Sequence, residues 1–449
     1  MRLLIPIVGL LAGALVLAVP AASGAAASKP SSKKKTPRRR APARGPAVSA
    51  KTRAEANRQV LDYLARALEY PPENPAALIP FFERLYRHER GEAAEPVRIL
   101  HFGDSHTAAD EWTGALRALF QQQFGDGGAG FSFAGKPFLG YRRLDLRGGA
   151  TRAWITDGLV GRNGDGQNGL GGISIRTRLP RQEVFLVAGC SNVEVFFLRQ
   201  PGGGSLMLYD NGSPVEKIAT SGEPGPGYHR YATAPGLHRL ELETLERAPV
   251  RLYGWVTENQ RGVTYEALGI NGAQASIVFR WDEALLADQL ARRSPALIVL
   301  AYGANEASNP DWTEASYRLM FSALIQRLRQ AAPAASILVI GPLDRMVRAR
   351  GKWTPHPRID LIAAAQREAA LPAGCAFWDL REKMGGKGSM RKWVLAGMAQ
   401  YDHVHFTAPG YRLLGETCFR DLIGQYAAFS RIREEVAGQS PNGQTSPNH

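Results

Sequence analysis

Cysteine is scarce in this chain: it occurs three times in 449 residues, and no two cysteines form a Cys-x-x-Cys pair. That absence argues against a zinc site held by thiolates. The glycine-rich stretches lack the Gly-Lys-Ser/Thr of a phosphate loop, and there is no dinucleotide-binding fingerprint. We therefore expect neither a metal ion nor an organic cofactor. Two arrangements of the cysteines stay open, namely a disulfide between Cys375 and Cys418 or three separate buried thiols that include Cys190.

Acidic residues are absent from residues 1–51, which hold ten of the 55 Lys and Arg and none of the 41 Asp and Glu. The net charge of +14 therefore falls to +4 for the rest of the chain. A nucleic-acid-binding protein is expected to carry a basic stripe on its folded part, and the sequence shows no such stripe. We expect no nucleic-acid partner.

The N-terminal segment predicts export. Residues 1–27 combine Arg2, a long apolar run and a small-residue cleavage site, which is typical of a signal peptide; an uncleaved membrane anchor is the alternative. Residues 28–52 are basic and rich in proline, and they predict a disordered linker. We expect a periplasmic or cell-envelope protein, with membrane association through the N-terminal segment left open.

The body of the chain divides by its hydrophobic pattern. Residues 53–149 hold two amphipathic helices and the first part of an α/β domain. Short alternating segments with glycine-rich turns predict an inserted β-sandwich or jelly roll over residues 150–260. Strands alternate with helices over residues 261–430, which predicts a parallel sheet covered on both faces. Residues 431–449 are expected to be a disordered tail.

Ser105 is the candidate nucleophile. An apolar run over residues 99–102 stops at Gly103, and a helical pattern begins near residue 110. This strand, turn and helix would place the small Ser105 side chain at a helix start, where backbone N–H groups favour negative charge. The alternative is a simple capping role, since Ser and Asp after a strand are common N-cap residues.

Two distant stretches favour the catalytic interpretation. A second buried strand ends in the turn Gly303-Ala304-Asn305, and the loop at 401–411 places Asp402 three residues before His405. A serine hydrolase needs a nucleophile, a base, a group that orients the base and donors for an oxyanion. We expect His405 to be the base and Asp402 its orienting carboxylate, with His403 and His106 as rivals for the base.

These blocks resemble a known family. Gly103-Asp104-Ser105, Gly272, Gly303-x-Asn305 and Asp402-x-x-His405 are similar, in order, to the Ser, Gly, Asn and His blocks of the SGNH (GDSL-type) hydrolases. The resemblance covers about residues 95–135 and 263–427. It implies a three-layer α/β/α fold with a five-stranded parallel sheet. It also implies an oxyanion hole made by the N–H groups of Ser105 and Gly272 and the Asn305 amide.

The extended forms Gly-Asp-Ser-His-Thr-Ala-Ala-Asp and Leu-Gly-Ile-Asn-Gly-Ala resemble the branch of peptidoglycan O-acetylesterases, in which an inserted domain like a carbohydrate-binding module is a family feature. The resemblance implies an acetylated cell-envelope polysaccharide as substrate. Two alternatives stay open, a polysaccharide O-acetyltransferase with the same triad and an inactive glycan-binding surface protein. Four aromatic side chains of the inserted module are candidates for stacking on sugar rings, although such residues are more often core or rim aromatics: Trp154, Tyr228, Tyr231 and Trp255.

Overall fold

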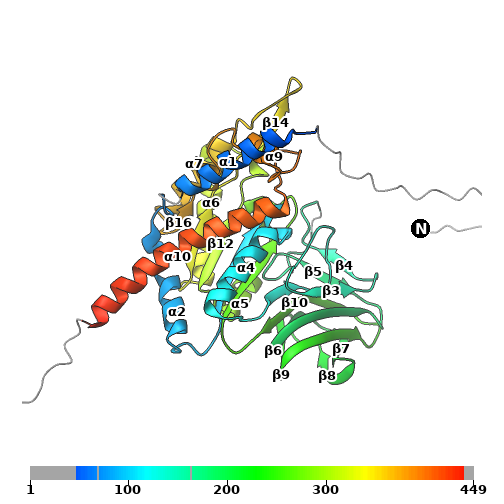
Figure 1. Cartoon of the computed structure of the whole chain (residues 1–449). Coiled ribbons are helices and arrows are strands. Elements are labelled where there is room, and N and C mark those ends of the chain that lie inside the picture. Colours follow the sequence, from blue (N-terminus) through cyan, green and yellow to red (C-terminus); the bar gives the residue numbers. More distant parts are fainter. Residues whose placement is uncertain (1–46, 68–69, 162–163, 439–449) are drawn as a thin grey trace, which may run out of the picture. The chain divides into compact units, whose positions relative to one another are not determined.

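The computed structural model describes residues 47–67, 70–161 and 164–438 (Figure 1). The predicted signal peptide or anchor, most of the predicted linker and residues 439–449 lie outside the described residues. Everything described belongs to one compact unit of the chain. None of its helices combines the length and apolar character needed to cross a membrane.

The catalytic half of the fold is a five-stranded parallel sheet in the order β11-β1-β12-β13-β16. This confirms the predicted α/β fold. The order reverses at β1, so the crevice at the carboxyl ends of β1 and β12 is where a ligand is expected to bind in such a sheet. The strands are β1 (Val97–Gly103), β11 (Val263–Gly269), β12 (Leu297–Ala301), β13 (Ser336–Ile340) and β16 (Ala376–Trp378).

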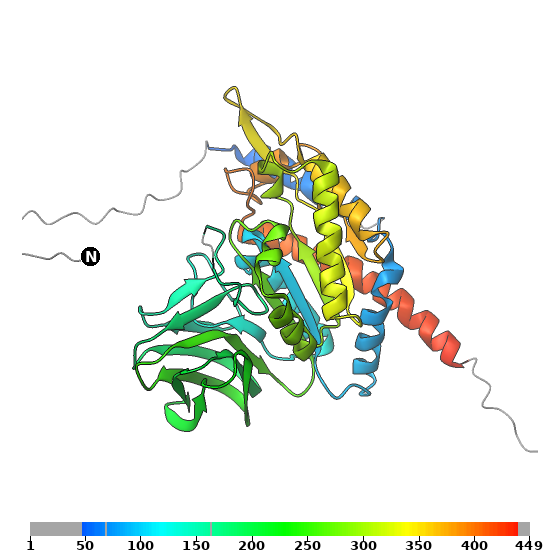
Figure 2. The ribbon, with the colours of Figure 1, turned by 180° about the vertical axis from the view of Figure 1, so that it is seen from behind.

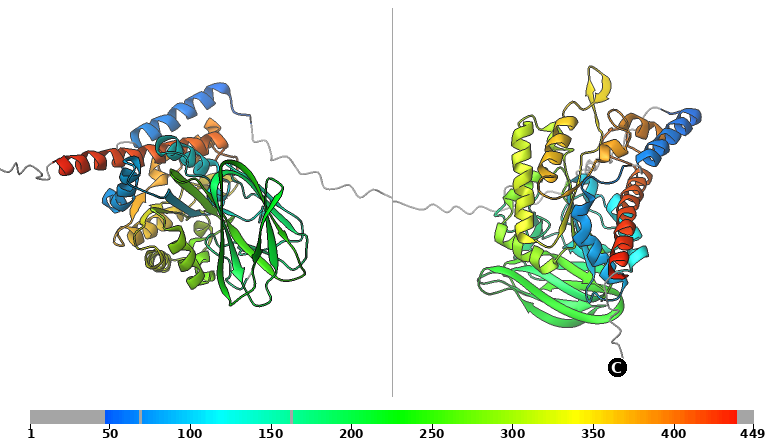
Figure 3. Two further views of the ribbon diagram at one scale, coloured as in Figure 1. Left: turned by 90° about the horizontal axis from the view of Figure 1, so that it is seen from below. Right: turned by 90° about the vertical axis from the view of Figure 1, so that its left-hand side faces the viewer.

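Helices cover both faces of this sheet (Figures 2 and 3). The core on one face includes α5 (Glu283–Arg293), α6 (Glu314–Ala331), α7 (Ile359–Ala370) and the short helix η2 (Ala275–Arg280). The core on the other face includes α1 (Ala50–Ala67), α2 (Ile79–Glu89), α4 (Glu111–Phe124), α9 (Met390–Ala396) and α10 (Ala408–Gly438). Four shorter helices complete this half: η1 (Pro75–Leu78), α3 (Ser105–Ala108), η3 (Glu306–Ser308) and α8 (Leu380–Lys383).

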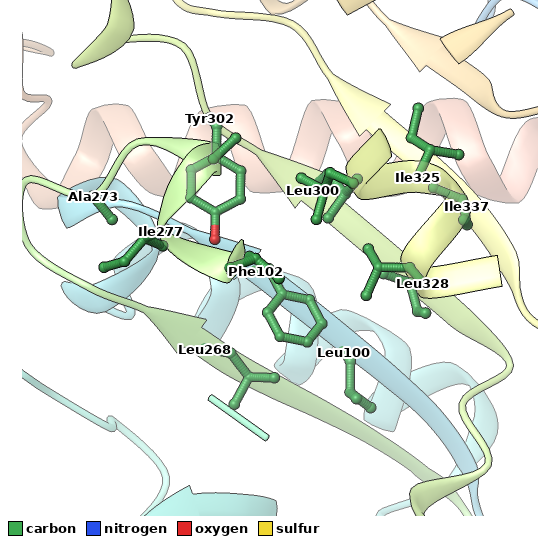
Figure 4. Packing of buried hydrophobic residues seen from close by; sticks show 14 of the residues in the cluster. Leu100, Phe102, Leu268, Ala273, Ile277, Leu300, Tyr302, Ile325, Leu328 and Ile337 are labelled. Carbon is green, nitrogen blue, oxygen red and sulfur yellow. The ribbon is translucent and has the colours of Figure 1, made fainter. Parts of the chain in front are cut away.

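The strand sequences explain this double cover. Alternate residues of β1 enter opposite cores, Leu100 and Phe102 on the α6 side and Ile99 on the α4 side. Figure 4 shows Leu100 and Phe102 packed beside Leu268 and Leu300 of the neighbouring strands. A strand that is buried on both faces is apolar along most of its length, although β1 also holds Arg98 and His101 and β11 holds Glu266. The apolar runs are what identified these strands in the sequence.

The inserted module is one nine-stranded antiparallel sheet. Its long strands β6 and β9 pair along their whole length, with a register shift at Cys190 and Asn192. Residues on either side of this shift, such as Leu186 and Val195, enter one shared core with Trp255. The strands are β2 (Gly130–Phe133), β3 (Arg147–Ala150), β4 (Ile155–Asp157), β5 (Ser174–Thr177), β6 (Glu183–Arg199), β7 (Ser205–Asp210), β8 (Ser213–Ala219), β9 (Gly225–Thr244) and β10 (Val250–Glu258).

Three predicted boundaries are wrong. The predicted disordered linker over residues 28–52 ends too late, because α1 begins at Ala50. The module sheet begins before residue 150, because β2 pairs with β10 and β3 pairs with β6. Glycine-rich sequence around these strands suggested turns, and long-range pairing outweighs that local signal. The predicted tail at residues 431–449 begins too early, because α10 continues to Gly438. Its last turns are mostly exposed, so they lack the apolar stripe that marks a packed helix.

The module and the catalytic half also share a core. Phe131, Phe196 and Tyr253 of the module belong to the same buried cluster as Leu268 and Leu100 of the parallel sheet. The ends of the insertion meet, since Gly127 donates its N–H to the carbonyl of Val263 at 3.1 Å. The module is therefore built into the fold and is not a separately tethered domain.

The three cysteines are free and buried. Cys375 lies just before β16, and Cys418 lies on α10. The structure thus has the arrangement with three separate thiols and not the disulfide between Cys375 and Cys418. Burial raises the pKa of the Cys190 thiol to about 12, which keeps it protonated.

Candidate active site

Ser105 sits where β1 ends and α3 begins. The side chain of Asp104 caps α3 by accepting the N–H of His106 at 3.0 Å. Two strand ends beside this turn require glycine. A Cβ on Gly103, at the end of β1, would lie 2.2 Å from Thr107 Oγ1, and one on Gly269, at the end of β11, would lie 2.2 Å from Ala108 N. The tight packing of α3 against two strand ends fixes where Ser105 points.

The three residues predicted as the triad form one hydrogen-bonded chain. Ser105 Oγ lies 3.0 Å from His405 Nε2. His405 Nδ1 lies 2.8 Å from Asp402 Oδ2, while Asp402 Oδ1 accepts the backbone N–H groups of Val404 and His405. The neutral histidine that fits these contacts carries its hydrogen on Nδ1 and offers Nε2 to the serine hydroxyl. The fold therefore joins residues 300 positions apart into an arrangement suited to nucleophilic catalysis.

Electrostatics support this arrangement. The hydrogen bond to Asp402 raises the pKa of His405 above its usual value, and partial burial opposes the rise. Burial also acts against the Asp402 carboxylate, but the hydrogen bonds from His405 outweigh it and lower the pKa of Asp402 to about 2. Asp402 is thus ionised at neutral pH, so it can stabilise an imidazolium on His405.

Among the described residues, neither rival histidine ring forms a hydrogen bond with Ser105 Oγ. His403 has a positive φ of 58°, and its ring lies against Trp353 with centroids 4.1 Å apart. His106 is buried, its Nδ1 lies 2.7 Å from Tyr411 Oη, and its ring stacks on His405 at 4.9 Å. Burial lowers the pKa of His106 to about 3, so a neutral ring supports the face of His405.

The predicted oxyanion donors Gly272 and Asn305 lie in turns that the Asn305 amide joins to the Ser105 turn, through Ala273 and Asp104. Gly272 has a φ of 76°, and a Cβ there would meet nothing within 4 Å, so open space surrounds it. Asn305 Nδ2 donates to the carbonyl of Ala273 at 2.9 Å and to Asp104 Oδ2 at 3.2 Å. Both amide hydrogens are therefore engaged, and an oxyanion would have to replace Asp104 as the acceptor. The oxyanion roles stay predictions.

Replacing Asn305 by alanine tests its role. If the amide binds the oxyanion, Asn305→Ala should lower kcat for a small acetyl ester by about 10²- to 10³-fold, because this donor acts mainly in the transition state. KM should change much less. The control is Asn309→Ala, since Asn309 Nδ2 donates to Gln274 Oε1 at 3.3 Å in the same region. An unchanged kcat in Asn305→Ala would remove the amide from the oxyanion hole.

Glu306 is a site residue that the sequence analysis missed. Its carboxyl group is fully buried and accepts the N–H of Ala275 at 2.7 Å and that of Gly303 at 2.9 Å. Burial raises the pKa of Glu306 to about 7, and these donors lower it. Glu306 thus ties together the two turns that carry Gly272 and Asn305. The only sequence signal was its place directly after Asn305, which does not reveal the direction of the side chain.

Glu306 makes stability depend on pH. Because its pKa is raised, the native state binds a proton more tightly than the unfolded state, so the free energy of unfolding should fall as pH rises from about 4.5 to about 7. The side chain at position 306 of the Glu306→Gln variant cannot ionise. The difference in the free energy of unfolding between wild type and this variant should therefore change by about 2–3 kcal/mol over this pH range. Urea unfolding at pH 4.5, 6 and 8 measures it, and a constant difference would contradict the shifted pKa.

The module contributes a loop to the site. In the β2–β3 connection, Leu139 accepts a hydrogen bond from Asn271 Nδ2 through its carbonyl at 3.0 Å, and Arg142 N–H donates to the carbonyl of Ala108 at 3.1 Å. The Leu139 side chain is 83% exposed. The Asp110 side chain holds this loop by accepting the N–H of Leu144 at 2.7 Å.

The candidate sugar-stacking aromatics are mostly engaged elsewhere. Trp255 is completely buried in the module core, so of the two possibilities it takes the core position and cannot stack on a sugar. Tyr228 hydrogen-bonds Asp288 on α5 and lies under the guanidinium of Arg292. Tyr231 Oη donates to Asp210, and Trp154 donates to the carbonyl of Glu183. Within the ranges that the structure describes, no group of three or more His, Cys, Asp or Glu residues could hold a metal ion.

Residues 234–413 match the GDSL-like Lipase/Acylhydrolase family, a range that contains Gly272, Asn305, Asp402 and His405 but not Ser105. A solved peptidoglycan O-acetylesterase is similar over 78% of this chain and 96% of its own, with 29% identity and a TM-score of 0.68. Family two carbohydrate esterases from Clostridium thermocellum (12% identity, 60% and 95% covered, TM-score 0.25) and Cellvibrio japonicus (11%, 63% and 99%, 0.25) are more distant. None of the curated proteins compared matches the chain.

Proposed function

We propose that this chain, which belongs to the SGNH (GDSL-type) hydrolases and is an esterase, removes O-acetyl groups from a cell-envelope glycan. The proposed glycan is peptidoglycan. Ser105 is the nucleophile, His405 the base and Asp402 the carboxylate that orients it. The observation that carries this proposal is the unbroken hydrogen-bonded chain from Ser105 through His405 to Asp402.

Acylation follows from these contacts. His405 Nε2 takes the hydroxyl proton as Ser105 Oγ forms a bond to the acetyl carbonyl carbon. The carbonyl oxygen becomes an oxyanion, which the N–H groups of Ser105 and Gly272 and the Asn305 amide stabilise. The tetrahedral intermediate collapses when the bond to the sugar oxygen breaks, and the His405 imidazolium gives its proton to that oxygen. The free sugar hydroxyl leaves and acetyl-Ser105 remains.

Deacylation repeats the steps with water. His405 takes a proton from the water as its oxygen attacks the acetyl carbonyl carbon. The second intermediate collapses, His405 returns the proton to Ser105 Oγ, and acetate leaves. If a sugar hydroxyl replaced water, the same residues would transfer the acetyl group, so the acceptor alone separates the two reactions.

The substrate proposal depends on the similarity to the peptidoglycan O-acetylesterase, which extends over nearly all of that chain. The module loop supports it as well, because it contacts Asn271, which precedes Gly272, and carries the exposed Leu139 side chain that a large substrate could contact. Export is the second part of the proposal and follows from the sequence of residues 1–27. An enzyme acting on the cell envelope would work in the periplasm, free or anchored through that segment.

One assay tests the proposal. The purified protein is incubated with O-acetylated peptidoglycan, with acetylated xylan or with 4-nitrophenyl acetate, and free acetate is measured with and without an oligosaccharide acceptor. We expect the highest kcat/KM on peptidoglycan and no acetylated oligosaccharide. Acetylation of the acceptor would identify a transferase. Release from xylan alone would overturn peptidoglycan as the substrate, and no release from any ester would overturn the esterase mechanism.

A further inference from the structure

A strongly basic hairpin stands beside the catalytic loop. It consists of β14 (Met346–Ala349) and β15 (Lys352–Pro355), which pair antiparallel. Residues 345–358 contain four Arg and one Lys and no Asp or Glu. Arg348, Arg350 and Lys352 are exposed, and none of the three forms a salt bridge with any residue that the structure describes. This concentration of unpaired charge contrasts with the near-neutral balance of the rest of the folded chain.

The base of the hairpin is fixed to both halves of the site. Met346 N–H donates to the carbonyl of His403 at 3.1 Å, within the loop that carries Asp402 and His405. The Arg345 guanidinium donates to the carbonyl of Ala304 in the Asn305 turn and to Ser308 Oγ. The base of the hairpin is therefore tied both to the loop of His405 and to the Asn305 turn.

Stacking fixes the hairpin further. The Trp353 ring lies on the His403 ring at 4.1 Å, and the Arg348 guanidinium lies 5.6 Å from the Trp353 ring on the same face of the hairpin. In the cross-strand register, Arg348 is opposite Trp353 and Ala349 is opposite Lys352. Arg348 is thus held by an aromatic ring that itself packs on the catalytic loop.

The turn of the hairpin contains an unfavourable residue. Arg350 and Gly351 are its two central residues, with φ values of 50° and 77°. A two-residue turn with two positive φ angles favours Asn, Asp or Gly at the first position, because a larger side chain is strained there. An arginine at this position lowers the local stability of the turn and places a positive charge at its tip. Such strain is common where a residue has a functional role.

We propose that this hairpin is an electrostatic arm that binds carboxylates of the polymeric glycan and so places an ester of that polymer over Ser105. The inference deepens the proposed function, on which it rests. Peptide stems give peptidoglycan many carboxylates, whereas a neutral acetylated glycan has none. Exposed, unpaired guanidinium and ammonium groups attract such a polyanion over about 10 Å at moderate salt.

The test variant is Arg348→Gln/Arg350→Asn/Lys352→Gln. It removes three positive charges from exposed positions, and Asn at position 350 suits the positive φ, so folding should be kept. A matched control, Lys217→Gln/Arg247→Gln/Arg431→Gln, removes three exposed positive charges on β8, on the loop between β9 and β10 and near the C-terminal end of α10. Strand β8 and the red C-terminal end of α10 lie away from β14 in Figure 1. Thermal unfolding of both variants checks that each is folded.

The substrates are O-acetylated sacculi, the same sacculi with their carboxylates converted to N-methylamides, and 4-nitrophenyl acetate. At low salt we expect the hairpin variant to lose about tenfold in acetate release from untreated sacculi relative to 4-nitrophenyl acetate, and the control to lose little. Wild type should show a similar loss on the amidated sacculi or in 0.5 M NaCl. Equal rates of the hairpin and control variants on untreated sacculi, or equal wild-type rates on both kinds of sacculi, would overturn the proposal.

Binding separates this proposal from the proposed function. Sedimentation of Ser105→Ala protein with sacculi, with and without the hairpin substitutions, needs no turnover. Weaker binding with the hairpin substitutions supports the arm even if wild type releases no acetate from sacculi. Unchanged binding overturns the arm even if deacetylation is confirmed. Hairpin-dependent binding to phosphatidylglycerol vesicles, with binding to sacculi unaffected, would overturn it in favour of a membrane contact.

Discussion

Ser105→Ala is expected to lower kcat for acetyl-ester hydrolysis by about 10⁴-fold or more. Ser105 Oγ, which lies 3.0 Å from His405 Nε2, is the atom that would form the bond to the acetyl group. Without this oxygen no covalent intermediate can form. Steady-state release of 4-nitrophenol from 4-nitrophenyl acetate measures the loss. The fold should be kept, because the side chain is small and only half-buried.

Ser308→Ala is the matched control for this variant. Ser308 lies in the turn after Asn305, is exposed and accepts a hydrogen bond from Arg345 through its Oγ at 2.9 Å. It should keep nearly full activity. A sulfonyl fluoride should modify wild type once, at Ser105. If Ser105→Ala retained more than a few per cent of the wild-type kcat in a preparation free of other esterases, another residue would be the nucleophile.

The candidate triad could be predicted because each part is encoded locally. One pattern is a strand that ends at Gly103, two residues before Ser105, and the other is a loop with Asp402 three residues before His405. Each pattern spans no more than a dozen residues. The parallel sheet then brings both to the same edge, as such sheets do for residues after their strands. The structure places the three side chains within hydrogen-bonding distance of one another.

Glu306 and Trp255 show what a local pattern does not contain. The Glu306 carboxyl group accepts hydrogen bonds from two backbone N–H groups in separate turns, and these contacts exist only after the chain folds. For Trp255 the short strand left a sugar-stacking position and a core position both open, and it is buried in a core that it shares with residues of β6 and β9. Burial at such positions is a property of the tertiary structure and not of the strand.

The start of the module was misplaced for a related reason. Strand β2 contains only Gly130–Phe133 and lies among glycines, so it has too few residues for a clear alternating pattern. It pairs with β10, more than 100 positions later in the chain. Phe131 and Phe133 then enter the core that the parallel sheet uses, which joins the module to the catalytic half.

His405→Ala is expected to reduce kcat almost as much as loss of the nucleophile, because Ser105 then has no base. Asp402→Asn should cost somewhat less, since His405 remains but loses the carboxylate that orients Nδ1–H and stabilises the imidazolium. His403→Ala is the control, because its ring lies on Trp353 and not on Ser105. Activity of the three variants on 4-nitrophenyl acetate gives the order directly. Inactivation by His403→Ala with activity kept in His405→Ala would reverse the assignment within this loop.

The pH profile adds a test that a purely structural role would not meet. His405 acts as a base only when neutral, so wild-type kcat/KM should rise with pH through the His405 pKa, which the Asp402 hydrogen bond raises above 6.5. Asp402→Asn removes that effect, so the rising limb should move to lower pH while the plateau falls. A structural defect would lower the plateau and leave the midpoint in place. A midpoint that stayed unchanged in Asp402→Asn would therefore show that Asp402 does not control the charge on the base.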